Sequence, residues 1–319
     1  MLKRLTPGWR LALVGGLVLL AAIFFMTVNM RAGWAFTLPF RGEKLWGLLL
    51  VAYCIAVSTV VFQTMTQNRI LSPGIMGFDF LYLLLQSLLL FFFGLHFFTQ
   101  LNAEIKWLGD VLVMTGAMCA LFYWLFVRQR RHLHVLVLVG IILGTLFRSL
   151  NALIARMMDP VEYDILQDVM FASFNQIETS LLGVASLLAL LVSLIGWRWI
   201  RDLDVLALGQ EQAVNLGLSP RRLMLGFLIG IAVLVSISTA LVGPVTFFGL
   251  LVANLAYQLA GTHRHIYVLP MAVALAALVL IGGQAILEHG LRFATGLSVI
   301  IEFVGGLFFL FLILKQGRK

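Results

Sequence analysis

Charged side chains are scarce in this sequence. Asp, Glu, Lys and Arg make up only 11% of its 319 residues, whereas 61% are hydrophobic and the mean hydropathy is +1.03. A soluble domain of this size carries about a quarter charged residues. A surface with so few charges suits lipid rather than water. The composition therefore argues against a soluble domain and predicts a membrane protein.

Cysteine and the sequence motifs of catalysis are also missing or rare. The two cysteines, Cys54 and Cys119, lie in apolar segments without C-x-x-C spacing and read as small core residues. No P-loop, HExxH or nucleophile elbow occurs, so the chain lacks its own ATP site. The pairs His132/His134 and His263/His265 stand beside arginines, which oppose metal binding. We expect no enzyme activity, no metal site and no cofactor.

Long apolar runs take the place of these motifs. Each is near the roughly 20 residues that a helix needs to cross the hydrocarbon layer, except the eighth, which is short. The first run follows basic residues like a signal peptide, but its length and the later runs indicate a retained helix. We predict an all-α polytopic protein with about ten spans in one transmembrane domain, 1–319. The segments are 11–30, 46–66, 75–93, 106–127, 133–156, 179–200, 222–242, 247–260, 267–287 and 296–315.

The basic residues indicate how the chain is oriented. The formal net charge is +8, but Lys and Arg form short clusters between apolar runs, which is typical of membrane topology rather than nucleic-acid binding. With both termini in the cytoplasm, 15 of the 22 Lys and Arg fall on the cytoplasmic side. We therefore predict a multi-pass protein of the inner (plasma) membrane, in contact with lipid and not with nucleic acid.

Polar residues at membrane depth are costly and mark candidate functional positions. The second run ends in a polar stretch, 63–69, and Pro73 and Gly74 then break the helix. In the fifth run, Arg148 either snorkels to the outer surface or lines a polar path. The predicted translocation path comprises Gln63, Thr66, Asn68, Arg148 and Asn151.

Two polar loops are candidates for contact with other proteins. The loop 159–168 faces outside and is acidic; it is either a solvated loop or a docking rim formed by Glu162, Asp164 and Asp168. The loop at about 202–221 is cytoplasmic, and Gly209 and Gly217 bracket one short helix in it. By itself this loop reads as an interfacial helix on the membrane.

Four segments resemble the motifs of the FecCD-type permeases, the vitamin-B12 and ferric-siderophore importer family, in the family's order. Residues 208–223, LGQEQAVNLGLSPRRL, resemble its coupling segment, L-G-x-x-x-A-x-x-L-G followed by a basic pair. Residues 242–252, VGPVTFFGLLV, are similar to A-G-P-I-x-F-V-G-L-I-V, and 62–78 resemble Q-x-x-x-x-N-P-L-A-x-P-x-x-L-G. Residues 296–315 resemble the final span.

The sequence departs from the family pattern at two places. Ala253, Asn254 and Tyr257 stand where the family commonly reads Pro-His-x-x-Arg. Residues 305–308, GGLF, replace G-x-P-x-F in the last span. The acidic loop with MFASFNQIETSLLG, 170–183, resembles the branch that handles catecholate siderophores.

The resemblance implies a permease subunit of an ABC importer for an iron(III)–siderophore complex of catecholate type. Its implied partners are a separate ATPase subunit, a second permease subunit (homo- or heterodimer), and a periplasmic or lipid-anchored substrate-binding protein. The iron stays in its chelator, so the resemblance implies no metal ligands. The implied ATPase contacts are Gly209, Glu211, Ala213, Leu216 and Gly217.

Other functions remain open at this point. Cobalamin or haem could be the cargo of the same kind of permease. An ion-coupled secondary transporter could instead use Asp79, Arg148 and Glu302 as coupling sites. Dependence on a separate ATPase discriminates the two classes.

Overall fold

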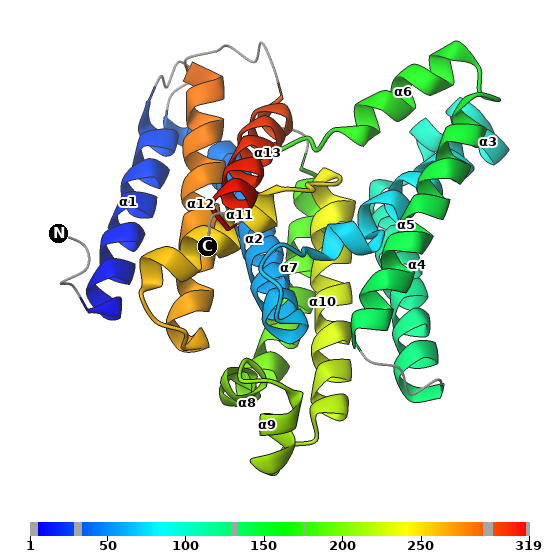
Figure 1. Ribbon diagram of the computed structural model, residues 1–319. Helices are drawn as coiled ribbons and strands as arrows, with labels where there is room; N and C mark the ends of the chain where they lie inside the picture. Colours follow the sequence, from blue (N-terminus) through cyan, green and yellow to red (C-terminus); the bar gives the residue numbers. More distant parts are fainter. Residues whose placement is uncertain (1–5, 29–33, 129–132, 175–176, 290–295, 317–319) are drawn as a thin grey trace.

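The computed structural model describes residues 6–28, 34–128, 133–174, 177–289 and 296–316, and within these ranges it contains helices and no strands (Figure 1). Five short helical segments are η2 (Pro73–Met76), the π-helix η3 (Tyr123–Arg128), α6 (Pro160–Met170), α8 (Ile200–Leu206) and α9 (Gln210–Asn215). The longer helices are α1 (Pro7–Thr27), α2 (Trp34–Thr66), α3 (Phe78–Gln100), α4 (Ala103–Phe122), α5 (Leu133–Ala155), α7 (Thr179–Arg198), α10 (Pro220–Val242), α11 (Phe248–Ala260), α12 (His265–His289) and α13 (Leu297–Gln316).

Every predicted apolar run coincides with a helix. Eight of the helices are long and apolar enough to cross a membrane; α11 and the described apolar part of α13, Leu297–Phe308, are shorter. The all-α membrane fold is therefore confirmed, while complete spans at the eighth and tenth runs stay a prediction. The cytoplasmic placement of both termini also stays a prediction. Residues 1–5, 129–132 and 317–319, which include part of the basic residues used for that prediction, lie outside the described part of the chain.

The second helix begins earlier than the sequence predicts. It starts at Trp34 rather than near residue 46, although residues 41–44 include charges. Those charges have partners: Arg41 Nη1 donates to the carbonyls of Phe25 and Val28 at the end of α1, at 2.8 and 2.7 Å, and Lys44 pairs with Glu288. Because local partners satisfy these groups, a charged stretch continues the helix.

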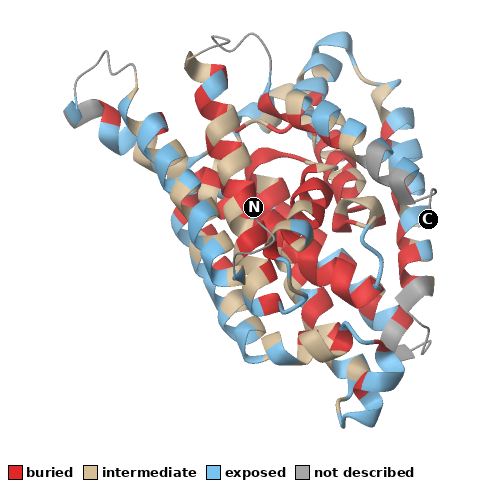
Figure 2. Ribbon diagram, turned by 60° about the vertical axis from the view of Figure 1, so that its left-hand side comes forward, coloured by how far each residue is buried: buried red, intermediate tan, exposed pale blue. Residues whose placement is uncertain are grey.

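The core lies around α2, α10 and α12. In α2 and α10, 67% of the most apolar window is buried, against 6% in α1 and 22% in α5 and α7. Figure 2 shows the same contrast, with red helices inside and pale blue ones outside. The outer helices expose large apolar residues, such as Leu19 and Leu20 of α1. Such surfaces face lipid.

Two glycine–proline breaks interrupt the helical bundle. After α2, the chain passes through η2 to Gly77, where φ is +95° and α3 begins. A Cβ at Gly77 would lie 2.8 Å from the Gly144 Cα, so the start of α3 packs directly on the backbone of α5. After α10, Gly243 has a φ of +96° and precedes Pro244. The predicted break at Pro73 and Gly74 is confirmed.

The two predicted polar loops lie at opposite ends of the molecule (Figure 1). The acidic segment is a helix, α6, rather than a loop, because Pro160 occupies its first turn and an apolar side, with Leu166 buried, packs inward. The other segment contains two short helices, α8 and α9, instead of one. Gly209 and Gly217 do bracket α9, as the sequence predicts.

Candidate functional site: the inner segment and its polar network

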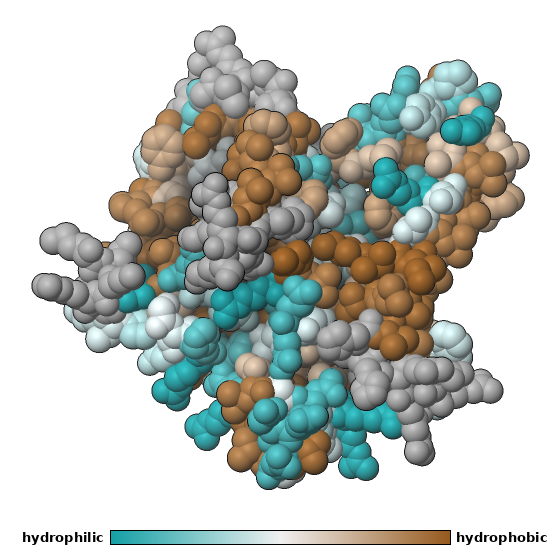
Figure 3. Space-filling view, viewed as in Figure 1, coloured by the Kyte–Doolittle hydropathy of each residue, from teal (hydrophilic) through white to brown (hydrophobic). Residues whose placement is uncertain are grey.

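The segment α8–α9 presents an apolar tip to the surroundings. Leu208, Val214 and Leu216 are each about 60% exposed. Figure 3 shows this tip as brown atoms among teal ones at the lower end of the molecule. Gly209 and Gly217, with φ of +116° and +82°, form its two turns, which side chains other than glycine rarely fit. An exposed apolar patch with a polar rim is typical of a protein–protein contact.

The predicted ATPase contacts fall into two groups in this segment. Glu211, Leu216 and Gly217 are exposed, whereas Gly209 is buried and Ala213 has no exposed surface. A Cβ at Gly209 would lie 2.6 Å from Gln212 Oε1 and 3.3 Å from Gln67 Nε2. The buried pair therefore positions the segment against the end of α2, and the exposed three form its surface.

A continuous polar network joins this segment to three membrane helices. Asp204 of α8 accepts from the backbone N of His265 at 2.8 Å and lies 2.5 Å from its Nδ1. On the other side of the ring, Nε2 lies 2.7 Å from Thr64 Oγ1 of α2, which lies 3.0 Å from the Tyr257 hydroxyl of α11. His265, at the start of α12, is only 1% exposed. Buried hydrogen-bonded networks of this kind fix the relative positions of the elements they join.

The same network holds the polar turn after α2. The Arg69 carbonyl accepts from Gln63 Nε2 and from Asn254 Nδ2, each at 2.9 Å. The Arg69 guanidinium lies 4.6 Å from the centroid of the Tyr257 ring, a cation–π contact. Asn254 and Tyr257 are positions at which the sequence departs from the family pattern, and both bind this turn.

The structure does not gather the predicted path residues into one site. Gln63 and Thr66 are buried, and Thr66 Oγ1 donates to the Phe62 carbonyl at 2.9 Å; Asn68 is exposed beside them. Arg148 and Asn151 lie in the half of α5 that leads to α6. Arg148 is exposed with its guanidinium 5.8 Å from the Phe80 ring centroid, and Asn151 Oδ1 has no partner among the described residues. The set therefore occupies the two ends of the membrane domain.

The predicted docking residues lie on α6, with Asp164 and Asp168 exposed and Glu162 partly so. Within the described ranges none of the three forms an ion pair. Asp168 also lines a cavity of about 380 Å³ below α6, together with Lys106, Asp110 and Glu178.

Sequence reasoning missed the network residues Asp204 and His265 and this cavity. In the sequence, the pair His263/His265 raises the question of metal ligation, but its spacing gives no sign of the hydrogen bond between His265 and Asp204. In the part of the chain that the structure describes, no three His, Cys, Asp or Glu residues form a metal-binding group.

Comparison with known proteins places this geometry in a family. The model of the FecCD transport family matches residues 11–315. The petrobactin import system permease protein YclO of Bacillus subtilis (strain 168) is 41% identical over 310 residues, 97% of this chain and 98% of that protein. FatC, the petrobactin import system permease of Bacillus anthracis, is 35% identical over 269 residues, 84% of this chain and 76% of that protein.

A solved structure supports the fold independently. It is described as an inward-facing conformation of a metal-chelate type ABC transporter, and it superposes with a TM-score of 0.83 at 20% identity. The match covers 97% of this chain and all of that one. With a family model spanning nearly the whole chain and two relatives above 30% identity, this chain belongs to the FecCD transport family.

Proposed function

We propose that this chain is a permease subunit of an ABC importer that carries an iron(III)–siderophore complex of catecholate type across the cell membrane. The observation that carries the proposal is the full-length likeness to YclO, whose name assigns it to petrobactin import. The chain is a transport subunit and not an enzyme, since members of this family work with a separate ATPase subunit.

The inner segment supports contact with that ATPase. Its exposed apolar tip, with Glu211 beside it, is the kind of surface that docks in a cleft of another protein. The network from Asp204 through His265 to Thr64 gives this segment a rigid connection to α12 and α2. Short packed helices move as rigid bodies, so a displacement at the tip reaches the membrane helices.

The cargo path and the outer docking surface complete the proposal. A large chelate needs weak and distributed contacts, because tight binding prevents release. Gln63, Thr66 and Asn68 at the inner end, and Arg148 and Asn151 at the outer half of α5, supply scattered polar groups of this kind. The acidic side chains of α6 suit a substrate-binding protein with basic residues on its docking face.

The test separates coupling from folding. Gly209→Val places a β-branched residue at a φ of +116°, and Glu211→Arg reverses a surface charge; the matched control is Gly183→Ala, on the exposed side of α7 with no atom within 4 Å of the new Cβ. We expect all three variants to insert normally into the membrane. Gly209→Val and Glu211→Arg should no longer co-purify with the ATPase, and their siderophore-dependent uptake should be at least about ten-fold lower than that of the control. Uptake that persists with both segment variants would contradict the coupling assignment.

A cargo panel tests the substrate class. Ferric complexes of catecholate and hydroxamate siderophores, haem and cobalamin are compared in the assembled transporter. We expect uptake of the catecholate complex alone to be ATP-dependent and saturable. Preference for haem would favour the second candidate cargo, since a hemin transport permease of Yersinia pestis is 26% identical over 96% of this chain.

A further inference from the structure

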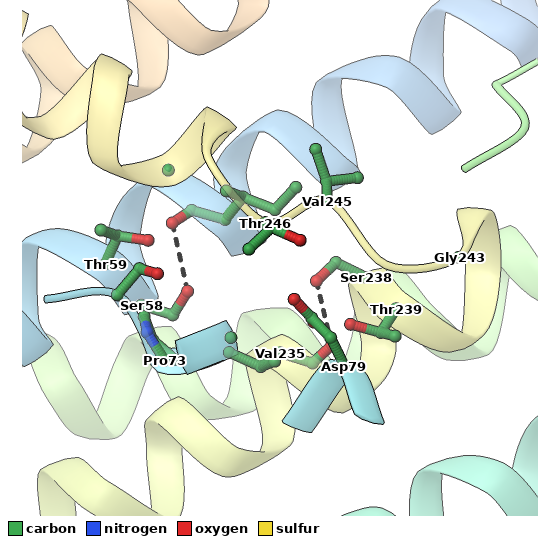
Figure 4. Close-up of a pocket in the computed structure, with 14 residues that line it drawn as sticks. Ser58, Thr59, Pro73, Asp79, Val235, Ser238, Thr239, Gly243, Val245 and Thr246 are labelled. Atoms are coloured by element: carbon green, nitrogen blue, oxygen red, sulfur yellow. Dashed lines mark hydrogen bonds between the residues drawn. The ribbon is translucent and has the colours of Figure 1, made fainter. Parts of the chain in front are cut away.

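A small polar cavity lies between the two helix breaks, deep in the membrane domain (Figure 4). It is bounded by α2, by η2 and the start of α3, and by the end of α10 with the link to α11. Its volume is about 30 Å³, which is enough to hold water or a small ion. Side-chain oxygens line it: Ser58, Thr59, Ser72, Asp79, Ser238 and Thr246.

The cavity contains a carboxylate without a compensating charge. Asp79 is 7% exposed, and its Oδ2 has no hydrogen-bond partner in the described part of the chain. Thr246 acts on the carboxylate as a hydrogen-bonding side chain and Glu302 as a neighbouring like charge, but no described Lys, Arg or His pairs with it. Ser72 Oγ, 3% exposed, is likewise without a partner. An unpaired buried carboxylate is strongly unfavourable in its charged form, so Asp79 either takes up a proton or binds a cation.

The hydroxyl groups determine which species fits. Ser58 Oγ donates its proton to the Ile55 carbonyl at 3.1 Å, and Ser238 Oγ donates to the Val235 carbonyl at 3.0 Å (dashed in Figure 4). Both oxygens therefore offer only lone pairs to the cavity. Together with Asp79 Oδ2 they make three acceptors that face the cavity. A cation satisfies all three at once.

We infer that this cavity is a binding site for a sodium ion. One carboxylate balances one positive charge, and the other lining groups are neutral oxygens, which suit a hard cation. Ca²⁺ takes six to eight oxygen ligands and Mg²⁺ loses its waters reluctantly, so neither suits a small cavity with one lining carboxylate. The cavity also faces the carbonyl end of α10, whose partial negative charge favours a cation.

The backbones close around the site through glycine. A Cβ at Gly249 would lie 2.2 Å from Thr59 Oγ1, and one at Gly74 would lie 2.4 Å from Asp79 Oδ2. Gly74 lies in η2 and Gly249 at the start of α11, each next to one of the two helix breaks. Because neither residue has a side chain, these segments approach the oxygens closely. An ion at this site thus holds α2, α3, α10 and α11 together. The proposed ion site departs from the expectation, drawn from the sequence, of no metal site, and it does not depend on the cargo.

The experiment measures the Tm of the assembled transporter in detergent, in NaCl, KCl or N-methylglucamine chloride at constant ionic strength. A ligand that binds only the folded state raises Tm by mass action. We expect a saturable increase of about 2–4 °C in Na⁺ and none in K⁺. Asp79→Asn abolishes the Na⁺ response, and Ser238→Ala moves its midpoint to about ten-fold higher Na⁺. Asp110→Asn, the control at another buried carboxylate that binds Gln86, keeps the response.

Two results would overturn the inference. The first is an equal response of the wild-type protein to Na⁺ and K⁺. The second is an unchanged Na⁺ midpoint in Ser238→Ala, which also decides the matter if Asp79→Asn does not assemble. Either result means that Asp79 is protonated and that the cavity holds water.

Discussion

The two ends of this permease, the α8–α9 end predicted to face the cytoplasm (inner) and the α6 end predicted to face outside (outer), treat their polar groups in opposite ways. At the inner end, Asp204, His265, Thr64 and Tyr257 bind one another across four helices. At the outer end, the described acidic side chains of α6 form no ion pair and point to the surroundings.

This difference matches two mechanical tasks. Linked groups keep a fixed geometry, so we expect the inner end to transmit displacement. Unlinked charges steer the approach of a partner and fix its register, at little energetic cost to the fold. Substitutions made at one end at a time test this comparison.

The largest effect is expected from His265→Ala. The substitution removes the ring that joins Asp204 to Thr64, while the backbone N–H of residue 265 still donates to Asp204. Uptake should fall about ten-fold while the ATPase still co-purifies, because the α9 surface is unchanged. ATP hydrolysis and cargo uptake are measured on the same reconstituted transporter.

The control for this variant is His263→Ala, two residues away and exposed. It removes an exposed histidine for which no hydrogen bond to the network is found among the described residues. If the two variants lose uptake to the same extent, the network is not the connection between the ends.

A smaller effect is expected from the double variant Asp164→Asn, Asp168→Asn in α6. The association rate of the substrate-binding protein should decrease about two- to five-fold at low salt, and the difference should shrink as salt screens the charges. Stopped-flow binding at several ionic strengths measures it. Glu104→Gln, an exposed acid at the start of α4, should leave the rate unchanged; a decrease as large as that of the double variant would mean that net charge, not α6, sets the rate.

The smallest effect is expected from Arg148→Gln. Arg148 is exposed, and its recorded contact is the ring of Phe80, so its loss should change Tm little. If it lines the path, uptake changes about two-fold through the KM for cargo. Arg156→Gln, also exposed and near the end of α5, is the comparison. Identical kinetics of the two variants would assign Arg148 to the lipid interface.

Local sequence signals predicted most of the fold. Hydropathy located the helices, proline and glycine located the break after α2, and two glycines bracketed α9. The network could not be predicted, because Thr64 and His265 are 201 residues apart and Asp204 and His265 are 61 apart. Periodicity reports only which face of a helix is buried. The helix α6 was described by its charges, so its apolar side and the starting turn at Pro160 were overlooked.

The backbone contact between Gly77 and Gly144 has a consequence for how the two ends communicate. With no side chain between them, the start of α3 and the middle of α5 cannot slide apart without opening a void. The segment that follows α2 is therefore packed tightly against α5, and a short link joins α5 to α6. We therefore expect a small tilt of the helices at the α8–α9 end to be transmitted, through this glycine contact, to α6 at the opposite end.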